Sequence, residues 1–293
     1  MALTVSRDLA ILYALTTEAR LGPKAVAGLI AHFGDPKSIW EAGTPEIAQV
    51  AHLDEDDFER LDGARNLTDA LVDDLELMID QGTTPIPITA EDYPHRLLGL
   101  PDPPSIVYVR GTLPADGTRT VAVVGTHQAD AEGIAEAVRW GKGFAERHVT
   151  VVSGLARGID GGAHTGSLAG GGQTCAVLGA GFDNIYPPEH RGLAEAIEKS
   201  GALITEYPPR AALTKPRLVF RNRIIVALAD AVVVVRLHED TRGSMEAIRR
   251  AGDLAMPVFL VAHDTGKASQ EAIAEGAIPI PSKPDFDLVL NYL

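Results

Sequence analysis

Cysteine is almost missing from this chain of 293 residues, since Cys175 is its only one. An internal disulfide is therefore excluded. The nine histidines are dispersed, and no Cys/His cluster has the spacing of a zinc site, so no bound metal is expected. Aromatic residues make up only 5% of the chain, which leaves few side chains on which a nucleic-acid base could stack.

Long apolar runs are also missing. No segment reaches the roughly 18 apolar residues that a membrane-spanning helix needs. The opening MALTVSRDLAILYAL is apolar, but Arg7 and Asp8 interrupt it and no small-residue cleavage site follows. We therefore expect a soluble, cytoplasmic protein that has no contact with a membrane.

Basic residues are outnumbered, 26 against 40 acidic ones, which gives a net charge of -14. This balance by itself argues against a phosphate-rich ligand, because phosphates attract cations. The charge is uneven, however: residues 1–109 carry -12, residues 110–250 carry +2 and residues 251–293 carry -4. An anionic ligand is therefore expected on the arginine-rich middle of the chain and not on its first third.

Hydrophobic periodicity divides the chain into three parts. In residues 1–81 apolar residues recur every three or four positions, which predicts a small helical module; within it, residues 21–34 look like a helix-hairpin-helix or sterile-alpha-motif (SAM) unit. Residues 82–118 are rich in proline and glycine, and they read as a connector with an edge strand at 106–109. Residues 119–293 form the third part.

The third part alternates short β-branched runs with helical segments. The runs are VAVVG, TVVSG, TCAVLG, ALIT, AVVVV and PVFLV. Near-continuous apolar strands predict a mainly parallel sheet that helices cover on both faces. This is a doubly wound, extended Rossmann-like α/β fold, in which ligands bind at the carboxyl ends of the strands.

Glycine loops at four predicted strand ends are suited to cradling phosphates, because glycine lets backbone N–H groups approach anionic oxygens. The candidates in these loops are Gly125, Thr126, His127, Ser153, Gly154, Arg157, Gly158, Asp160, Gly179, Gly181, Phe182, Gly243 and Ser244. The segment FRNRII adds Arg221, Asn222 and Arg223, which suit charge-assisted phosphate contacts. No dinucleotide or P-loop fingerprint is complete, so no cofactor is expected.

Some of these side chains also have structural interpretations. Asp160 could pair with Arg157 or cap a helix, and Arg221 and Arg223 could pair with carboxylates such as Glu206 to fix loops. Ion-pair networks of this kind imitate functional sites. Both interpretations stay open from the sequence.

Several blocks together resemble DNA-processing protein A, the DprA/Smf family. They are EDYPHRLLGLPDPPSIVYVRG at 91–111, SGLARGIDGGAH at 153–164, AVLGAGFDNIYPPEH at 176–190, ITEYPP at 204–209 and FRNRII at 220–225. The likeness follows the family order over nearly the whole chain. It implies a homodimer that binds single-stranded DNA, contacts the recombinase RecA and acts as a recombination mediator in natural transformation, without being an enzyme.

Two departures from the family pattern remove cations. His127 stands where the family usually has arginine, and Gln173 stands where lysine is common. Both losses predict weaker DNA binding, since histidine is mostly neutral at pH 7. For the homodimer, the apolar segments AVVVV and IIVALAD are candidate contact surfaces.

A second hypothesis is a Rossmann-like sensor or hydrolase of a phosphorylated nucleotide derivative, with Glu246 as general acid or base. A third is hydrolysis by Ser153, His164 and Asp160, which have the residue types of a triad but lack the G-x-S-x-G elbow.

Overall fold

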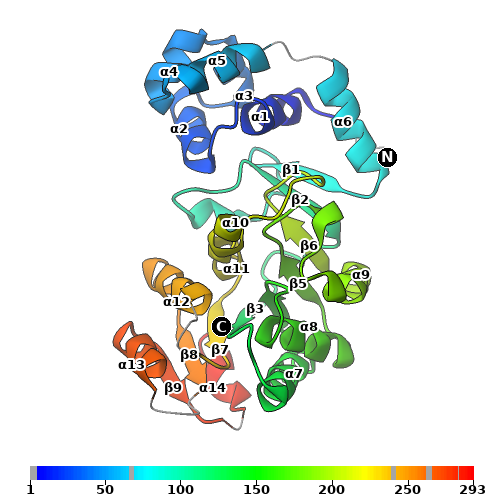
Figure 1. The fold of residues 1–293 in the computed structure, drawn as a ribbon, viewed down its shortest axis with the longest axis vertical. Helices are drawn as coiled ribbons and strands as arrows, with labels where there is room; N and C mark the ends of the chain where they lie inside the picture. Colours follow the sequence, from blue (N-terminus) through cyan, green and yellow to red (C-terminus); the bar gives the residue numbers. More distant parts are fainter. Residues whose placement is uncertain (1–4, 66–68, 239–241, 262–265, 283) are drawn as a thin grey trace. The chain divides into compact units, whose positions relative to one another are not determined.

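The computed structural model describes residues 5–65, 69–238, 242–261, 266–282 and 284–293 (Figure 1). The chain forms two compact units, Met1–Tyr108 and Val109–Leu293. The boundary between them lies inside the predicted connector at 82–118.

The first unit begins with helices, as the periodicity predicts. They are α1 (Arg7–Thr17), α2 (Pro23–Phe33), α3 (Pro36–Glu41), α4 (Thr44–Ala51), α5 (Glu55–Ala64) and α6 (Asp69–Asp80). Helix α2 follows its sequence signals: Pro23 occupies its first turn, and Gly34, with φ of 92°, ends it. In α1, Ile11, Leu12 and Leu15 are fully buried and form part of the core of this unit.

The proline-rich segment continues the first unit with β1 (Thr84–Pro87), the 3-10 helix η1 (His95–Gly99) and β2 (Ile106–Gly111). The predicted strand at 106–109 is therefore β2, and β1 lies beside it at the end of the strand order. Two hydrogen bonds fold this segment onto itself, from the Ile88 N–H to the Ser105 carbonyl (2.9 Å) and from the Tyr93 hydroxyl to the Pro104 carbonyl (2.7 Å).

The second unit is the predicted parallel α/β fold. Its elements are β3 (Thr120–Val124), α7 (Ala131–Ala145), β4 (Thr150–Ser153), α8 (Ile159–Ala169), β5 (Thr174–Val177), η2 (Phe182–Asn184), η3 (Pro188–His190), α9 (Arg191–Ser200), β6 (Ala202–Thr205), α10 (Lys215–Phe220), α11 (Asn222–Ala227), β7 (Ala231–Val234), α12 (Arg242–Asp253), β8 (Val258–Val261), α13 (Lys267–Ala274), β9 (Ile278–Ile280) and α14 (Phe286–Leu290). From β3 to β9 the strands lie in the order β6-β5-β4-β3-β7-β8-β9 and pair in parallel.

The strand order reverses at β3. Val121 of β3 pairs with Val151 of β4 on one side and with Ala231 of β7 on the other. Because parallel crossovers are right-handed, the two halves place their helices on opposite faces: α7, α8 and α9 lie on one side of the strands, and α12 and α13 on the other (Figure 1). The doubly wound prediction is confirmed. In such a sheet, ligands bind beside the strand at which the order reverses.

The two apolar segments expected to supply a dimer surface are inside this unit instead. Strand β7, the first four residues of AVVVV, lies between β3 and β8, and its residues and Val235 are buried. Helix α11 is also buried along its whole length. Both segments are apolar because they form the core.

Among the described residues, no helix combines the length and apolar character needed to cross a bilayer.

Candidate nucleic-acid interface

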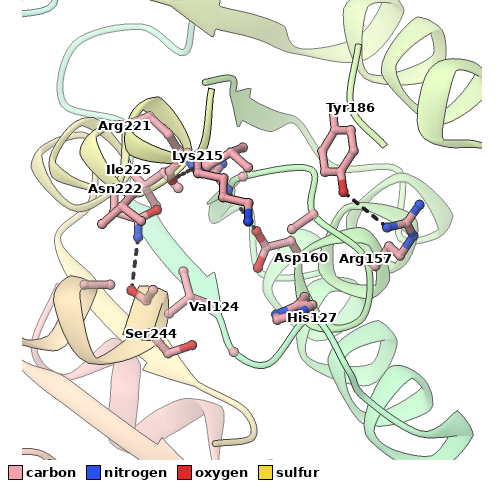
Figure 2. A pocket seen from close by; sticks show the side chains of 17 residues that line it. Val124, His127, Arg157, Asp160, Tyr186, Lys215, Arg221, Asn222, Ile225 and Ser244 are labelled. Carbon is pink, nitrogen blue, oxygen red and sulfur yellow. Dashed lines mark hydrogen bonds and ion pairs between the residues drawn. The ribbon is translucent and has the colours of Figure 1, made fainter. Parts of the chain in front are cut away.

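A cavity of about 410 Å³ lies at the carboxyl ends of β3 and β4, and α10, α11 and the first two turns of α12 line its other side (Figure 2). The predicted site residues that line it are Gly125, His127, Gly154, Arg157, Asp160, Arg221, Asn222, Gly243 and Ser244. The loops after β3 and β4 therefore converge with the α12 start, as the doubly wound topology requires. The remaining lining is mostly apolar and includes Val124, Leu218, Val219, Ile225 and Ala247.

A buried ion pair forms part of the cavity floor. The Arg221 guanidinium lies 3.7 Å from the Asp160 carboxylate and donates to the carbonyl of Val177 (2.6 Å) and to that of Leu218 (3.2 Å). Burial raises the pKa of Asp160 and lowers that of Arg221, and the attraction between the two charges opposes both shifts. Arg221 thus uses its Nε and Nη1 donors on backbone carbonyls and faces Asp160 with Nη2, which links the segments around the cavity.

Gly154 makes the position of Arg221 possible. A Cβ atom at residue 154 would lie 1.6 Å from Arg221 Nη1 and 2.0 Å from its Cζ. The guanidinium thus stacks directly on the backbone of the loop after β4. The sequence predicted a close approach at this glycine, and the approaching group in the structure is a side chain of the protein.

Asn222 and Arg223 also have structural partners. Asn222 is buried, and its side-chain amide donates to the Gly243 carbonyl at 3.0 Å, which ties α11 to the start of α12. Arg223 is 1% exposed, pairs with Glu206 at 2.6 Å and lies 4.1 Å from the centre of the Phe220 ring. The pairing of Arg223 with Glu206 that the sequence left open is therefore present.

The exposed polar groups gather at the mouth of the cavity. Arg157 donates to the Glu189 carboxylate (2.5 Å) and approaches the Tyr186 hydroxyl (3.4 Å), and Figure 2 shows Arg157 and Tyr186 side by side. Asp160, which the sequence offered as a partner of Arg157, pairs with Arg221 instead. His127 is also exposed and lines the cavity from the loop after β3.

Lys215 is the lining cation that the sequence reasoning missed. It is the first residue of α10 and directly follows the N-cap residue Thr214. Figure 2 shows its side chain pointing into the cavity. Within the described part of the chain, no hydrogen bond or ion pair holds its amino group. The residues directly before it, 210–214, belong to none of the sequence blocks named above, although Thr214-Lys215-Pro216 is a pattern that predicts the start of a helix.

The other predicted residues shape the loops without lining the cavity. Thr126 and Ser153 are buried; the Thr126 N–H donates to the Arg236 carbonyl (2.9 Å), and the Ser153 hydroxyl donates to that of Val123 (2.6 Å). Gly158, with φ of 71°, starts α8. The loop after β5 does not line the cavity; its members are Gly179, Gly181 and the buried Phe182.

The side chains of the alternative catalytic hypotheses are engaged elsewhere. The hydroxyl of Thr174 donates to the Val151 carbonyl (2.7 Å), so His164 Nδ1 donates to that hydroxyl (2.7 Å). Burial lowers the pKa of His164 to about 3, and this fixes the neutral ring. Glu246 pairs with Arg250 at 2.9 Å and does not line the cavity.

Together, the reversal of strand order at β3 and the cavity beside it define a Rossmann-like protein with a candidate ligand-binding cavity at its switch point. Residues 84–288 match the family model described as DNA recombination-mediator protein A. The chain therefore belongs to the DNA recombination-mediator protein A family, as its sequence blocks predict.

Individual relatives agree with this assignment. DNA processing protein DprA of Bacillus subtilis is 36% identical over 184 residues, which cover 62% of this chain and 61% of that protein. Protein Smf of Escherichia coli is 39% identical over 205 residues, 66% of this chain and 53% of the relative. The matches thus span about half to three fifths of these relatives.

Two solved structures share the fold. The X-ray structure of DNA processing protein A from Streptococcus pneumoniae aligns over 99% of both chains with a TM-score of 0.83 and 25% identity. DNA processing protein A from Helicobacter pylori, whose structure was described for its single-stranded DNA binding mode, aligns over 72% of this chain and 97% of that one, with a TM-score of 0.63 and 24% identity.

Proposed function

We propose that this chain binds single-stranded DNA at the cavity and acts as a recombination mediator that delivers the strand to a RecA-type recombinase in natural transformation, without a catalytic step. The observation that carries the proposal is a cavity at the β3 switch point with exposed cations at its mouth and an apolar wall inside. Membership in the family and the binding mode described for the Helicobacter relative support it.

The phosphates of a bound strand would contact the mouth of the cavity. Lys215 and Arg157 supply positive charge there, His127 adds a polar contact, and the first turns of α8 and α12 add the favourable potential of helix N-termini. Backbone groups of Gly125, Gly154, Gly243 and Ser244 line the same space. Asp160, Arg221 and Asn222 hold these loops in place, while Thr126, Ser153, Gly158, Gly179, Gly181, Phe182 and Arg223 shape the surrounding framework.

The apolar wall suits an uncharged surface such as the flat face of a base. Leu218, Val219, Ile225 and Ala247 form this wall, and Tyr186, 41% exposed, stands at the rim. Stacking and apolar contact are independent of base identity, so binding without sequence preference follows.

A salt titration tests the proposal. Labelled oligothymidine should bind in a fluorescence anisotropy assay. The logarithm of its association constant should fall linearly with the logarithm of the salt concentration, with a slope of about 0.7 per phosphate contact. Lys215→Gln should weaken binding about two- to tenfold at about 0.1 M salt, whereas Lys199→Gln, an exposed lysine in the last turn of α9, should not. Absence of binding by the unmodified chain at low salt would contradict the proposal.

A sensor of a small phosphorylated nucleotide is the second candidate, because a cavity of about 410 Å³ is of the size that small ligands occupy. The pairing of Glu246 with Arg250 argues against a hydrolytic version of this candidate. Thermal melting separates the two functions, since only a ligand that binds the folded state raises the melting temperature. Nucleotides should raise it under the second candidate, and oligonucleotides under the first.

The recombinase contact and the homodimer are part of the proposal through the family resemblance. Light scattering of the purified chain would test the dimer, and co-sedimentation with a RecA-type recombinase on oligothymidine would test the contact. A monomer at all concentrations, or no co-sedimentation, would remove the corresponding part of the proposal.

A further inference from the structure

The Arg157–Glu189 pair at the cavity mouth differs from the other ion pairs of the site. Its side chains are 49% and 52% exposed, whereas those of Arg221 and Asp160 are 6% and 8% exposed and those of Arg223 and Glu206 are 0% and 6% exposed. Breaking a buried pair leaves a desolvated charge, but breaking an exposed pair returns both groups to water. The Arg157–Glu189 pair can therefore open at small cost.

The pair also occupies the donors that a ligand would use. Arg157 lines the cavity, and its Nε donates to Glu189 Oε1, while Nη1 approaches the Tyr186 hydroxyl. Hydrogen bonding from Arg157 lowers the pKa of the Glu189 carboxyl, so the carboxylate is charged at neutral pH. A phosphate and a carboxylate bind a guanidinium through the same N–H groups. Only one of them can occupy the Nε side of Arg157.

We propose that Glu189 limits strand binding at this mouth, because its carboxylate competes with a DNA phosphate for Arg157. The inference rests on the proposed function and adds an affinity-setting residue to it. Glu189 lies in η3, next to the cavity lining and not in it. Its removal should therefore release a cation without taking a contact away from the ligand.

The test compares Glu189→Gln with Glu195→Gln. Glu195 is exposed on the adjacent helix α9, so the second variant makes the same charge change away from Arg157. Glu189→Gln should bind labelled oligothymidine about two- to fivefold more tightly at about 0.1 M salt, the range of an exposed ion pair. Its salt slope should steepen by about 0.7, since the freed Arg157 adds one phosphate contact. Glu195→Gln should keep the affinity of the unmodified chain.

A second comparison separates competition from general repulsion. In an Arg157→Gln background, Glu189→Gln should give no gain, because the cation that it releases is gone. Equal affinities of the Glu189→Gln and Glu195→Gln variants would overturn the inference, and so would a gain that persists without Arg157. Glu189→Asp, whose shorter side chain loosens the pair at constant charge, should give a smaller gain and serves if the glutamine variant melts early.

Failure of the proposed function has a different signature. In that case the unmodified chain, Glu189→Gln and Arg157→Gln would all fail to bind oligothymidine at low salt. If instead the unmodified chain binds in a salt-dependent way and Glu189→Gln matches it, only the role of Glu189 is refuted.

Discussion

At the scale of single residues, the cavity floor depends on Gly154, because this residue has no side chain. The Arg221 guanidinium lies against the backbone of Gly154, where it reaches both Asp160 and the Val177 carbonyl. Any side chain at residue 154 would occupy the space of the guanidinium. Because Arg221 is buried, displacing it would leave a charge without its partners.

Gly154→Ala should accordingly lower the free energy of unfolding by about 1–3 kcal/mol, the usual cost of overpacking. Gly192→Ala is the matched control, since no atom lies within 4 Å of a Cβ there and the residue is in helix α9. That variant should leave stability unchanged or raise it by up to about 1 kcal/mol. Urea unfolding of both variants measures the difference, and equal stability of the two would disprove the role of Gly154.

The residue types of the site could be predicted from the sequence, but the exposure of their side chains could not. Arg157, Arg221 and Arg223 looked equivalent as phosphate contacts. In the structure Arg157 is half exposed, while Arg221 and Arg223 are 5% and 1% exposed. Exposure depends on which carboxylate each arginine meets, and these carboxylates come from three separate segments: Glu189 from η3, Asp160 from α8 and Glu206 from the loop after β6. Such pairings require the tertiary fold.

At the scale of elements, α12 is positioned by a side chain from the preceding helix. Asn222 opens α11 and donates to the carbonyl of Gly243, the second residue of α12. Gly243 and Ser244 then line the cavity. The contact therefore sets where the α12 N-terminus, with its positive potential, faces the cavity.

Asn222→Ala should lower the free energy of unfolding by about 1–2 kcal/mol, since a buried amide and its hydrogen bond are lost. Amide hydrogen exchange in peptides from residues 243–253 should become faster, because the first turn of α12 loses its anchor. Asn291→Ala, at the exposed end of α14, should change neither quantity measurably. Unaltered exchange in α12 would show that Asn222 does not hold this helix.

Strands β2 to β8 were predictable because each is a short, mostly apolar run, as in β3 with its VAVV core. Strands β1 and β9 were not predicted, because each is only three or four residues long and contains proline. The wall of the cavity was harder to foresee. Helix α10 spans only Lys215–Phe220, too few residues for a helical period to show, so Lys215 and Val219 had no hydrophobic periodicity around them.

At the scale of the whole molecule, charge is divided between the parts of the chain. Residues 1–109 carry a net charge of -12 and residues 110–250 a net charge of +2. The cavity and its cations belong to the second of these stretches. A polyanion is repelled by the first stretch and tolerated by the second.

Photo-crosslinking with oligothymidine that contains 4-thiothymidine tests this division. Crosslinked peptides identified by mass spectrometry should fall within residues 110–250 and include the loop after β4. High salt should abolish the crosslinks, because they depend on phosphate contacts. Crosslinks concentrated in residues 1–109 would contradict the assignment of the binding surface.

The reversal of strand order at β3 has a consequence for the newly made chain. One side of the cavity comes from the loops after β3 and β4, and the other side comes from α10, α11 and the first two turns of α12. A ribosome makes these two sides one after the other, so the cavity stays open until residues as late as Ala247 have emerged and docked. Unfinished chains therefore lack the complete pocket, and the strand binding that we propose would require molecules whose synthesis has passed this point.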